Sequence, residues 1–255
     1  MVKELRAPAG LAPVIVAIAA IAIGFPAVAT AQQPAAPSTS TNQQARQAPS
    51  AGATRYTDMA SDQNFVIEER GRGALLQFEG SKEVIPLQAV PAPRGDTVLK
   101  SDSGQVMLRK TEAGNMVSFI GNKDGAPADV VGRAAPLGAP AMPASLDELR
   151  KQSAARLSRL AGHEVTIFGT AEFADNEQWA ADALTNVEIG VQRANGLAGK
   201  AAAKLTAVRL VRAKAWSVAF KDGELVLGVN PDQGYAGRAS SDAIANTLSA
   251  SRNAG

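Results

Sequence analysis

Cysteine is absent from the 255 residues of the chain, and its absence removes several kinds of chemistry at once. Without a thiol the chain has no disulfides, no thiolate metal ligands, no cysteine nucleophile and no lipid-modified cysteine. Histidine is nearly as scarce: His163 is the only one, so His-rich metal sites are excluded and one imidazole base remains. The sequence therefore predicts no metal site, and no motif in it indicates a cofactor.

An excess of charge of one sign is also missing. The 26 Lys and Arg residues nearly balance the 24 Asp and Glu residues, which leaves a formal net charge of +2. Proteins that bind nucleic acids usually concentrate basic residues on one face, so we expect no nucleic-acid partner. With 45% apolar and 20% charged residues, the composition is that of a globular chain long enough for two modest domains.

The first 31 residues have the pattern of an export signal. Lys3 and Arg6 form a basic start, Leu11 to Ile23 form an apolar run, and small residues precede Ala31. This pattern predicts cleavage near Ala31 and a periplasmic location for the mature protein.

The alternative for this segment is an uncleaved membrane anchor. Pro13, Gly24 and Pro26 interrupt the apolar run and shorten the usable helix below the roughly 20 residues that a span requires. Cleavage is therefore favoured, and we expect no stable transmembrane segment after it.

Composition divides the rest of the chain into four parts. Residues 32–54 are rich in Gln, Pro, Ala and Ser and predict a disordered linker. Residues 55–134 read as an all-β domain, residues 135–144 as a Pro/Ala linker, and residues 145–255 as an α+β domain. The predicted fold class is α+β, with an N-terminal antiparallel β-meander domain followed by helices packed on an antiparallel sheet.

The all-β assignment depends on short apolar runs separated by turn residues. The six runs begin near Phe65, Leu75, Val84, Thr97, Val106 and Met116. Their spacing of roughly ten residues is typical of an antiparallel meander, in the form of a small barrel or a curved sheet. Pro86 lacks a backbone N–H, so its strand is expected at an edge or at a bulge.

The clearest local signal in the C-terminal part is a β-hairpin over Trp216–Val229. Asp222-Gly223 favours a type I′ turn, and pairing outward from it places Phe220 opposite Leu225 and Val218 opposite Leu227, all on one face. A helix over about Asn176–Asn195 has apolar residues at helical spacing and is the best cover for that face. A second helix is expected to begin after Ser145, whose side chain can cap it.

Two patterns could bind or transform a ligand. Acidic residues gather at the start of the covering helix and could supply a carboxylate pair for hydrolysis: Glu172, Asp175, Glu177 and Asp182. Acidic residues are also what a helix N-terminus favours, so we predict no catalytic residue there. His163 follows a helix-ending glycine and is interpreted as structural.

The loop Asn230–Arg238 is the better candidate for binding, because it joins a predicted strand to a predicted helix. Tyr235 offers a flat amphipathic surface, and Arg238 offers a bidentate donor for a carboxylate or phosphate. The alternative is a structural loop in which Arg238 pairs with a neighbouring carboxylate such as Asp242. We predict Tyr235 and Arg238 as binding residues.

The helix after Ser145 carries Arg150, Arg156 and Arg159, and a second hypothesis is that these bind anionic lipid. A solvated helical face is the favoured interpretation.

Four segments of the β domain resemble a family of small exported alphaproteobacterial proteins that is known only as a domain of unknown function. The segments are Leu76–Ser81, Glu83–Leu87, Pro91–Asp96 and Leu108–Thr111. The resemblance implies an envelope location and a Gram-negative origin, and it carries over no activity and no site residues.

The sequence as a whole favours a non-enzymatic binding or interaction module of the bacterial cell envelope. Its partner would be an envelope protein or a cell-wall or lipid component. A carboxylate-dependent cell-envelope hydrolase is the alternative, and whether the protein has any catalytic activity stays open at this stage.

Overall fold

The computed structural model describes residues 52–198 and 201–253. The predicted signal peptide and nearly all of the predicted linker lie outside these residues. The described residues all belong to one compact unit. The fold class is α+β, as predicted, with an eight-stranded closed barrel followed by a layer of helices on a second sheet.

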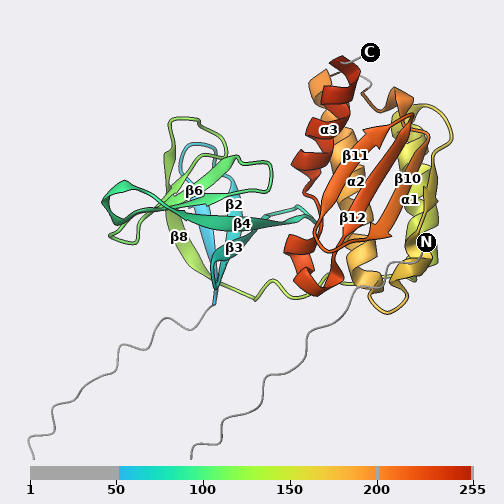
Figure 1. The fold of residues 1–255 in the computed structure, drawn as a ribbon. Coiled ribbons are helices and arrows are strands. Elements are labelled where there is room, and N and C mark those ends of the chain that lie inside the picture. Colours follow the sequence, from blue (N-terminus) through green and yellow to red (C-terminus); the bar gives the residue numbers. More distant parts are fainter. Residues whose placement is uncertain (1–51, 199–200, 254–255) are drawn as a thin grey trace, which may run out of the picture. The chain divides into compact units, whose positions relative to one another are not determined.

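The barrel is an antiparallel meander in which each strand pairs with the next (Figure 1). Its strands are β1 (Ala53–Asp58), β2 (Asn64–Arg70), β3 (Gly73–Phe78), β4 (Val84–Pro91), β5 (Thr97–Lys100), β6 (Val106–Lys110), β7 (Met116–Ser118) and β8 (Ala126–Ala134). Strand β8 closes the barrel by pairing with β1, from Ala53 opposite Ala134 to Asp58 opposite Ala128. Of the two forms the meander could take, the chain therefore adopts the barrel.

The barrel interior is filled by apolar side chains. Alternate residues of each strand point inward, as the two-residue period of a strand requires. Phe65, Leu76 and Leu108 are fully buried, and Ile67 and Ile85 are nearly so. The predicted runs supplied six of the eight strands; β1 and β8 were missed, because neither carries a clear apolar alternation.

Pro86 marks a place where the barrel wall is incomplete. It pairs with Leu75 of β3, but the pairing of β4 with β5 begins only at Gln88. The first half of β4 therefore has a free edge, which is the position predicted for a strand that contains proline. This free edge faces the residues that form the candidate site described below.

The C-terminal part contains helices and a four-stranded sheet in the order β11-β12-β10-β9. The elements are α1 (Leu146–Ala161), β9 (Thr166–Phe168), the short 3-10 helix η2 (Thr170–Phe173), α2 (Glu177–Ala198), η3 (Ala201–Lys204), β10 (Ala207–Arg212), β11 (Ser217–Lys221), β12 (Glu224–Val229), η4 (Pro231–Gly237) and α3 (Ser241–Asn253). In the barrel, η1 spans Pro93–Gly95.

The prediction of an antiparallel sheet in this part was wrong, because the sheet is mixed. Strand β10 is parallel to both β9 and β12, and only β11 and β12 pair antiparallel. Helix α2 connects β9 to β10 as a crossover, which is the connection that parallel neighbours require. The β11–β12 hairpin then folds back so that β12 inserts beside β10.

The hairpin itself agrees with the prediction. Asp222 and Gly223 both have positive φ, as a type I′ turn demands, and Phe220 lies opposite Leu225 and Val218 opposite Leu227. The turn fixes this register locally, so no distant contact was needed to predict it.

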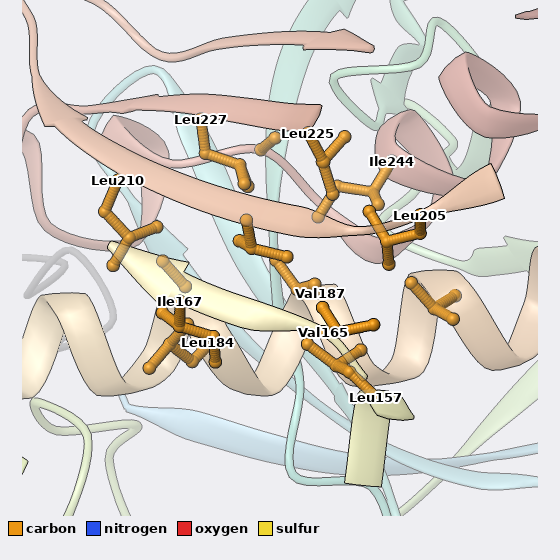
Figure 2. Packing of buried hydrophobic residues seen from close by; sticks show 14 of the residues in the cluster. Leu157, Val165, Ile167, Leu184, Val187, Leu205, Leu210, Leu225, Leu227 and Ile244 are labelled. Atoms are coloured by element: carbon orange, nitrogen blue, oxygen red, sulfur yellow. The ribbon is translucent and has the colours of Figure 1, made fainter. Parts of the chain in front are cut away.

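Helices α1 and α2 pack on one face of the sheet, and α3 packs beside α2 (Figure 1). Figure 2 shows the core between them, where side chains from helices and strands point toward one another; the labelled members include Leu157, Val187, Leu210, Leu227 and Ile244.

Two local features set the positions of these helices. Ser145 Oγ accepts a hydrogen bond from Glu148 N at 3.3 Å, and Gly162 ends α1 in the left-handed conformation, so both predicted caps of α1 are confirmed. Gly190 lets α3 approach α2 closely, since a Cβ there would lie 2.8 Å from Ile244.

Candidate functional site

The connector between the barrel and α1 is bound to the barrel at Leu137. The Leu137 N–H donates to Glu68 Oε2, and Arg70 Nη2 donates to the Leu137 carbonyl at 2.7 Å. Arg70 also forms an ion pair with Glu68, so these two side chains together bind the backbone N–H and the backbone carbonyl of Leu137. The Leu137 side chain packs with Leu75, Val84 and Tyr235. Hydrogen bonds and apolar packing thus fix the connector to the barrel at Leu137.

Tyr235 lies on the other side of that connector. It belongs to η4, is 7% exposed, and donates its hydroxyl proton to the Gly138 carbonyl at 2.8 Å. Its ring meets the Trp179 ring edge to face, with centroids 5.1 Å apart. Gly234 next to it has a positive φ, and a Cβ there would lie 3.3 Å from the indole. The loop therefore needs glycine to bring Tyr235 against Trp179.

Arg238 is 1% exposed, and its guanidinium binds partners inside the protein. Its Nε donates to Asp182 of α2, and its Nη2 donates to the Val84 carbonyl at 2.8 Å, on the free edge of β4. Its predicted partner in the structural alternative was Asp242, but Asp242 pairs with Arg193. Arg238 thus joins α2 to the barrel.

The N-terminus of α3 is held by carboxylates from the barrel. Glu83 accepts from the Ser241 N–H at 2.8 Å and from the Ser241 hydroxyl, and Asp102 accepts from the N–H and hydroxyl of Ser240. Ser240 Oγ in turn accepts from Ala243 N, so Ser240 caps the helix. Negative charge at this end also complements the helix dipole.

We use the name seam for the residues that make these contacts: Glu68, Glu83, Val84, Asp102, Leu137, Asp182, Tyr235, Arg238, Ser240 and Ser241. About half of them belong to the barrel and about half to the C-terminal part. The seam contains four carboxylates and one guanidinium, and all but Asp102 of these five groups are buried. Two cavities open along it, and Tyr235 and Gly138 border both.

The first, which we name the aromatic cavity, has a volume of about 500 Å³. It is lined by the aromatic residues Trp179 and Tyr235 and by Leu75, Pro86 and Leu87 from β3 and β4. Its lining also includes four polar residues: Arg70, Arg72, Gln88 and Gln233.

The second, which we name the polar cavity, has a volume of about 590 Å³. One wall is the connector from Pro136 to Pro143, and the others come from α1, α2 and the β3–β4 turn. Its polar side chains are Gln77, Ser81, Lys82, Gln152, Ser153, Arg156, Asp182, Thr185, Glu188 and Tyr235. Both volumes lie within the range of about 300–1,000 Å³ that small-molecule sites occupy.

Two groups at these cavities have shifted pKa values. Burial raises the pKa of Asp182 above its usual value, and the neighbouring Arg238 opposes that rise. Burial also raises the pKa of Tyr235, and the charge of Asp182 adds to the effect. Tyr235 therefore stays protonated and keeps its bond to the Gly138 carbonyl.

The four carboxylates considered for hydrolysis do not share a cavity. Asp182 lines the polar cavity. Glu172 accepts from the Arg212 backbone N–H, and Asp175 forms an ion pair with the Arg212 side chain, away from both cavities. His163 Nε2 donates to the Leu205 carbonyl at 2.8 Å, which agrees with its structural interpretation.

Of the two predicted binding residues, Tyr235 lines both cavities, whereas Arg238 is buried outside their linings with its guanidinium carbon 5.4 Å from the centre of the Tyr235 ring. Their role in binding stays a prediction. Sequence reasoning missed the other walls, which come from β3, β4, α1 and the connector. The proline-rich connector was visible, but nothing local showed that it lies against α1 and α2.

Within residues 52–198 and 201–253, no set of three or more His, Asp or Glu residues could hold a metal ion. In the same residues, no helix has the length and apolar character needed to cross a membrane.

A family model described as Domain of unknown function (DUF4908) matches residues 34–248. No curated protein and no solved structure matches the chain.

Proposed function

The chain belongs to the family described as Domain of unknown function (DUF4908), and from that premise we propose that it is a non-catalytic binding protein of the bacterial cell envelope. The proposal assigns binding to the two cavities along the seam. Export to the periplasm is part of the proposal and follows from the signal pattern of residues 1–31.

The observation that carries the proposal is the position of Tyr235. Its ring and hydroxyl border two cavities of ligand size, and its hydroxyl is fixed by the bond to the Gly138 carbonyl. Cavities that lie between structural layers and combine aromatic walls with a few fixed polar groups are the usual form of a binding site.

Pairing of the acidic groups supports binding over catalysis. General acid–base work needs groups that are free to give or take a proton near the substrate. Asp175 is paired with Arg212, Asp182 with Arg238 and Glu188 with Arg156. These ion pairs favour a structural role for the three carboxylates over a catalytic one.

The hydrolase alternative has one observation in its favour. Asp182, with its raised pKa, and Glu188 line the same cavity, and a pair of carboxyls in one cavity is what a glycoside hydrolase uses. In that alternative these two residues take the place of Glu172 and Asp175.

For the test, the full chain is produced in a Gram-negative host and purified from the periplasm. The N-terminus of the purified protein is expected near Gln32. Soluble fragments of digested cell wall and vesicles with anionic lipid are then offered separately, and both bound ligand and any released product are measured by mass spectrometry. We expect binding without turnover.

A matched pair of variants locates the site. Ala139 is exposed and lines both cavities, so Ala139→Trp adds a large side chain at their shared border. Ala135 is exposed on the same connector and lines neither cavity, so Ala135→Trp is the control. Binding lost only in Ala139→Trp supports the proposal. Turnover that disappears in Asp182→Asn while the fold persists would replace it with the hydrolase, and equal binding by both Trp variants would remove the cavities from it.

A further inference from the structure

Three of the four hydroxyl groups that line the polar cavity donate their protons to protein acceptors, whereas Ser81 Oγ accepts from Glu83 N. Tyr235 donates to the Gly138 carbonyl, Thr185 donates to the Ala181 carbonyl at 3.1 Å, and Ser153 donates to Glu188. A hydroxyl that donates inward can still accept through its oxygen lone pairs. These three groups therefore offer a ligand acceptors rather than donors.

Asp182 adds a stronger acceptor to the lining of the cavity. The residue is 5% exposed, its Oδ2 accepts from Arg238, and its Oδ1 accepts no hydrogen bond from any residue that the structure describes. Because Asp182 lines the cavity and this oxygen is not sealed from it, a donor of a bound ligand can reach it. An ammonium group is the donor that matches a set of oxygens which includes a carboxylate.

The lining of the cavity also includes two cationic side chains, Lys82 and Arg156. Lys82 is exposed on the β3–β4 turn and forms no ion pair with the described residues. Arg156 lies nearby in the lining but is occupied by Glu188 and Gln152. Lys82 is thus the cation left to receive a ligand carboxylate.

The balance of charge limits the ligand further. Arg238 neutralises Asp182, and Arg156 neutralises Glu188, so a ligand with a net positive charge gains no net attraction from these two pairs. A ligand with one ammonium and one carboxylate leaves the charges balanced and supplies a donor for Asp182 and an acceptor for Lys82.

We propose that the polar cavity binds a small zwitterion of the amino-acid or short-peptide class, with its ammonium at Asp182 and its carboxylate at Lys82. This inference rests on the proposed binding function and names the ligand class of one of its two cavities.

The test measures binding by calorimetry with the mature chain and four probes: L-alanine, L-alanyl-L-alanine, N-acetyl-L-alanine and L-alaninamide. The two zwitterions are expected to bind, and the one with the lower Kd identifies the amino acid or the dipeptide as the better fit. N-acetylation removes the ammonium and is expected to weaken binding at least tenfold. The amide removes the carboxylate and is expected to weaken it about fivefold.

Variants connect these losses to residues. Asp182→Asn disturbs the buried pair, so Thr185→Val and Lys82→Gln are used as well, because both positions are at least partly exposed. Lys82→Gln should weaken zwitterion binding about fivefold and leave L-alaninamide unchanged, whereas the exposed Lys123→Gln, away from the cavity, should change neither.

Absence of binding heat for both zwitterions at millimolar concentration would overturn the inference. So would equal affinity for L-alanine and N-acetyl-L-alanine, or equal binding by Lys82→Gln and Lys123→Gln. If the zwitterions fail while cell-wall fragments still bind and Ala139→Trp abolishes that binding, the ligand class is wrong and the binding function stands.

Discussion

The barrel interior and the seam are both buried, but they are built from opposite kinds of residue. Inside the barrel, Phe65, Leu76 and Leu108 pack against other apolar side chains. Along the seam, Glu83 and Arg238 are buried with charged or backbone partners. Apolar packing tolerates changes of shape, whereas a buried charge needs its own partner at a fixed distance. The difference indicates that the polar contacts of the seam fix the positions of the residues that line the two cavities.

The largest effect is expected from Arg238→Met. The substitution leaves the Asp182 carboxylate buried without its partner and the Val84 carbonyl without its donor. Unfolding in urea should show a loss of about 3–5 kcal/mol. Arg238→Met combined with Asp182→Leu removes both charges and should recover most of that loss.

Leu76→Ala in the barrel is the comparison for the single and double variants at Arg238 and Asp182. It should cost about 2–5 kcal/mol through lost contacts and a cavity, with no single partner whose removal restores stability. A double variant at Arg238 and Asp182 that stays as unstable as Arg238→Met would contradict the distinction between the two regions.

An intermediate effect, dependent on pH, is expected at Glu68. Burial alone would raise the pKa of Glu68, but hydrogen bonds from Arg70 and Leu137 and the charge of Arg70 outweigh it and lower the pKa. A carboxyl whose pKa is lowered by folding stabilises the protein above its unfolded pKa, and this contribution disappears as pH falls through the folded value.

Glu68→Gln should therefore reduce stability at pH 7 by about 1.5–3 kcal/mol, and the difference from the unmodified chain should shrink toward pH 3. Glu69→Gln, at the exposed neighbouring position, is the control and should change stability by less than about 0.5 kcal/mol. A difference that grows on acidification would show that the sign is wrong.

The smallest effect is expected from Tyr235→Phe, which removes one hydroxyl and its bond to the Gly138 carbonyl. The expected loss is about 1 kcal/mol in urea unfolding. Tyr56→Phe in the barrel is the matched control, because the Tyr56 ring stacks on Phe65 and its packing survives the change. Equal stability of the two variants would mean that Tyr235 does not hold the connector.

What could be predicted from the sequence was local. The Asp222-Gly223 turn specified its hairpin and register, and the caps of α1 specified where that helix begins and ends. Both depend on residues within a few positions of one another, so the sequence pattern contains all the necessary information.

What could not be predicted depends on long-range contacts. The partner expected for Arg238 was four residues away, but the partner found, Asp182, lies on a different helix. The mixed sheet arises because β12 inserts beside β10, which no turn motif encodes. The polar cavity likewise exists only once the connector is brought near α1 and α2.

The pairing of β1 with β8 sets the order in which the barrel can form. All other neighbours in it are consecutive strands, whose contacts close over short stretches of chain. Ala53 and Ala134 lie at opposite ends of the barrel sequence, so among the strand pairings of the barrel this one has the largest loop-closure cost. A chain that emerges N-terminus first therefore exposes two unpaired strand edges until β8 arrives, and those edges can pair with another chain. The two edges of β1 and of the most recent strand are removed only after β8 has been added.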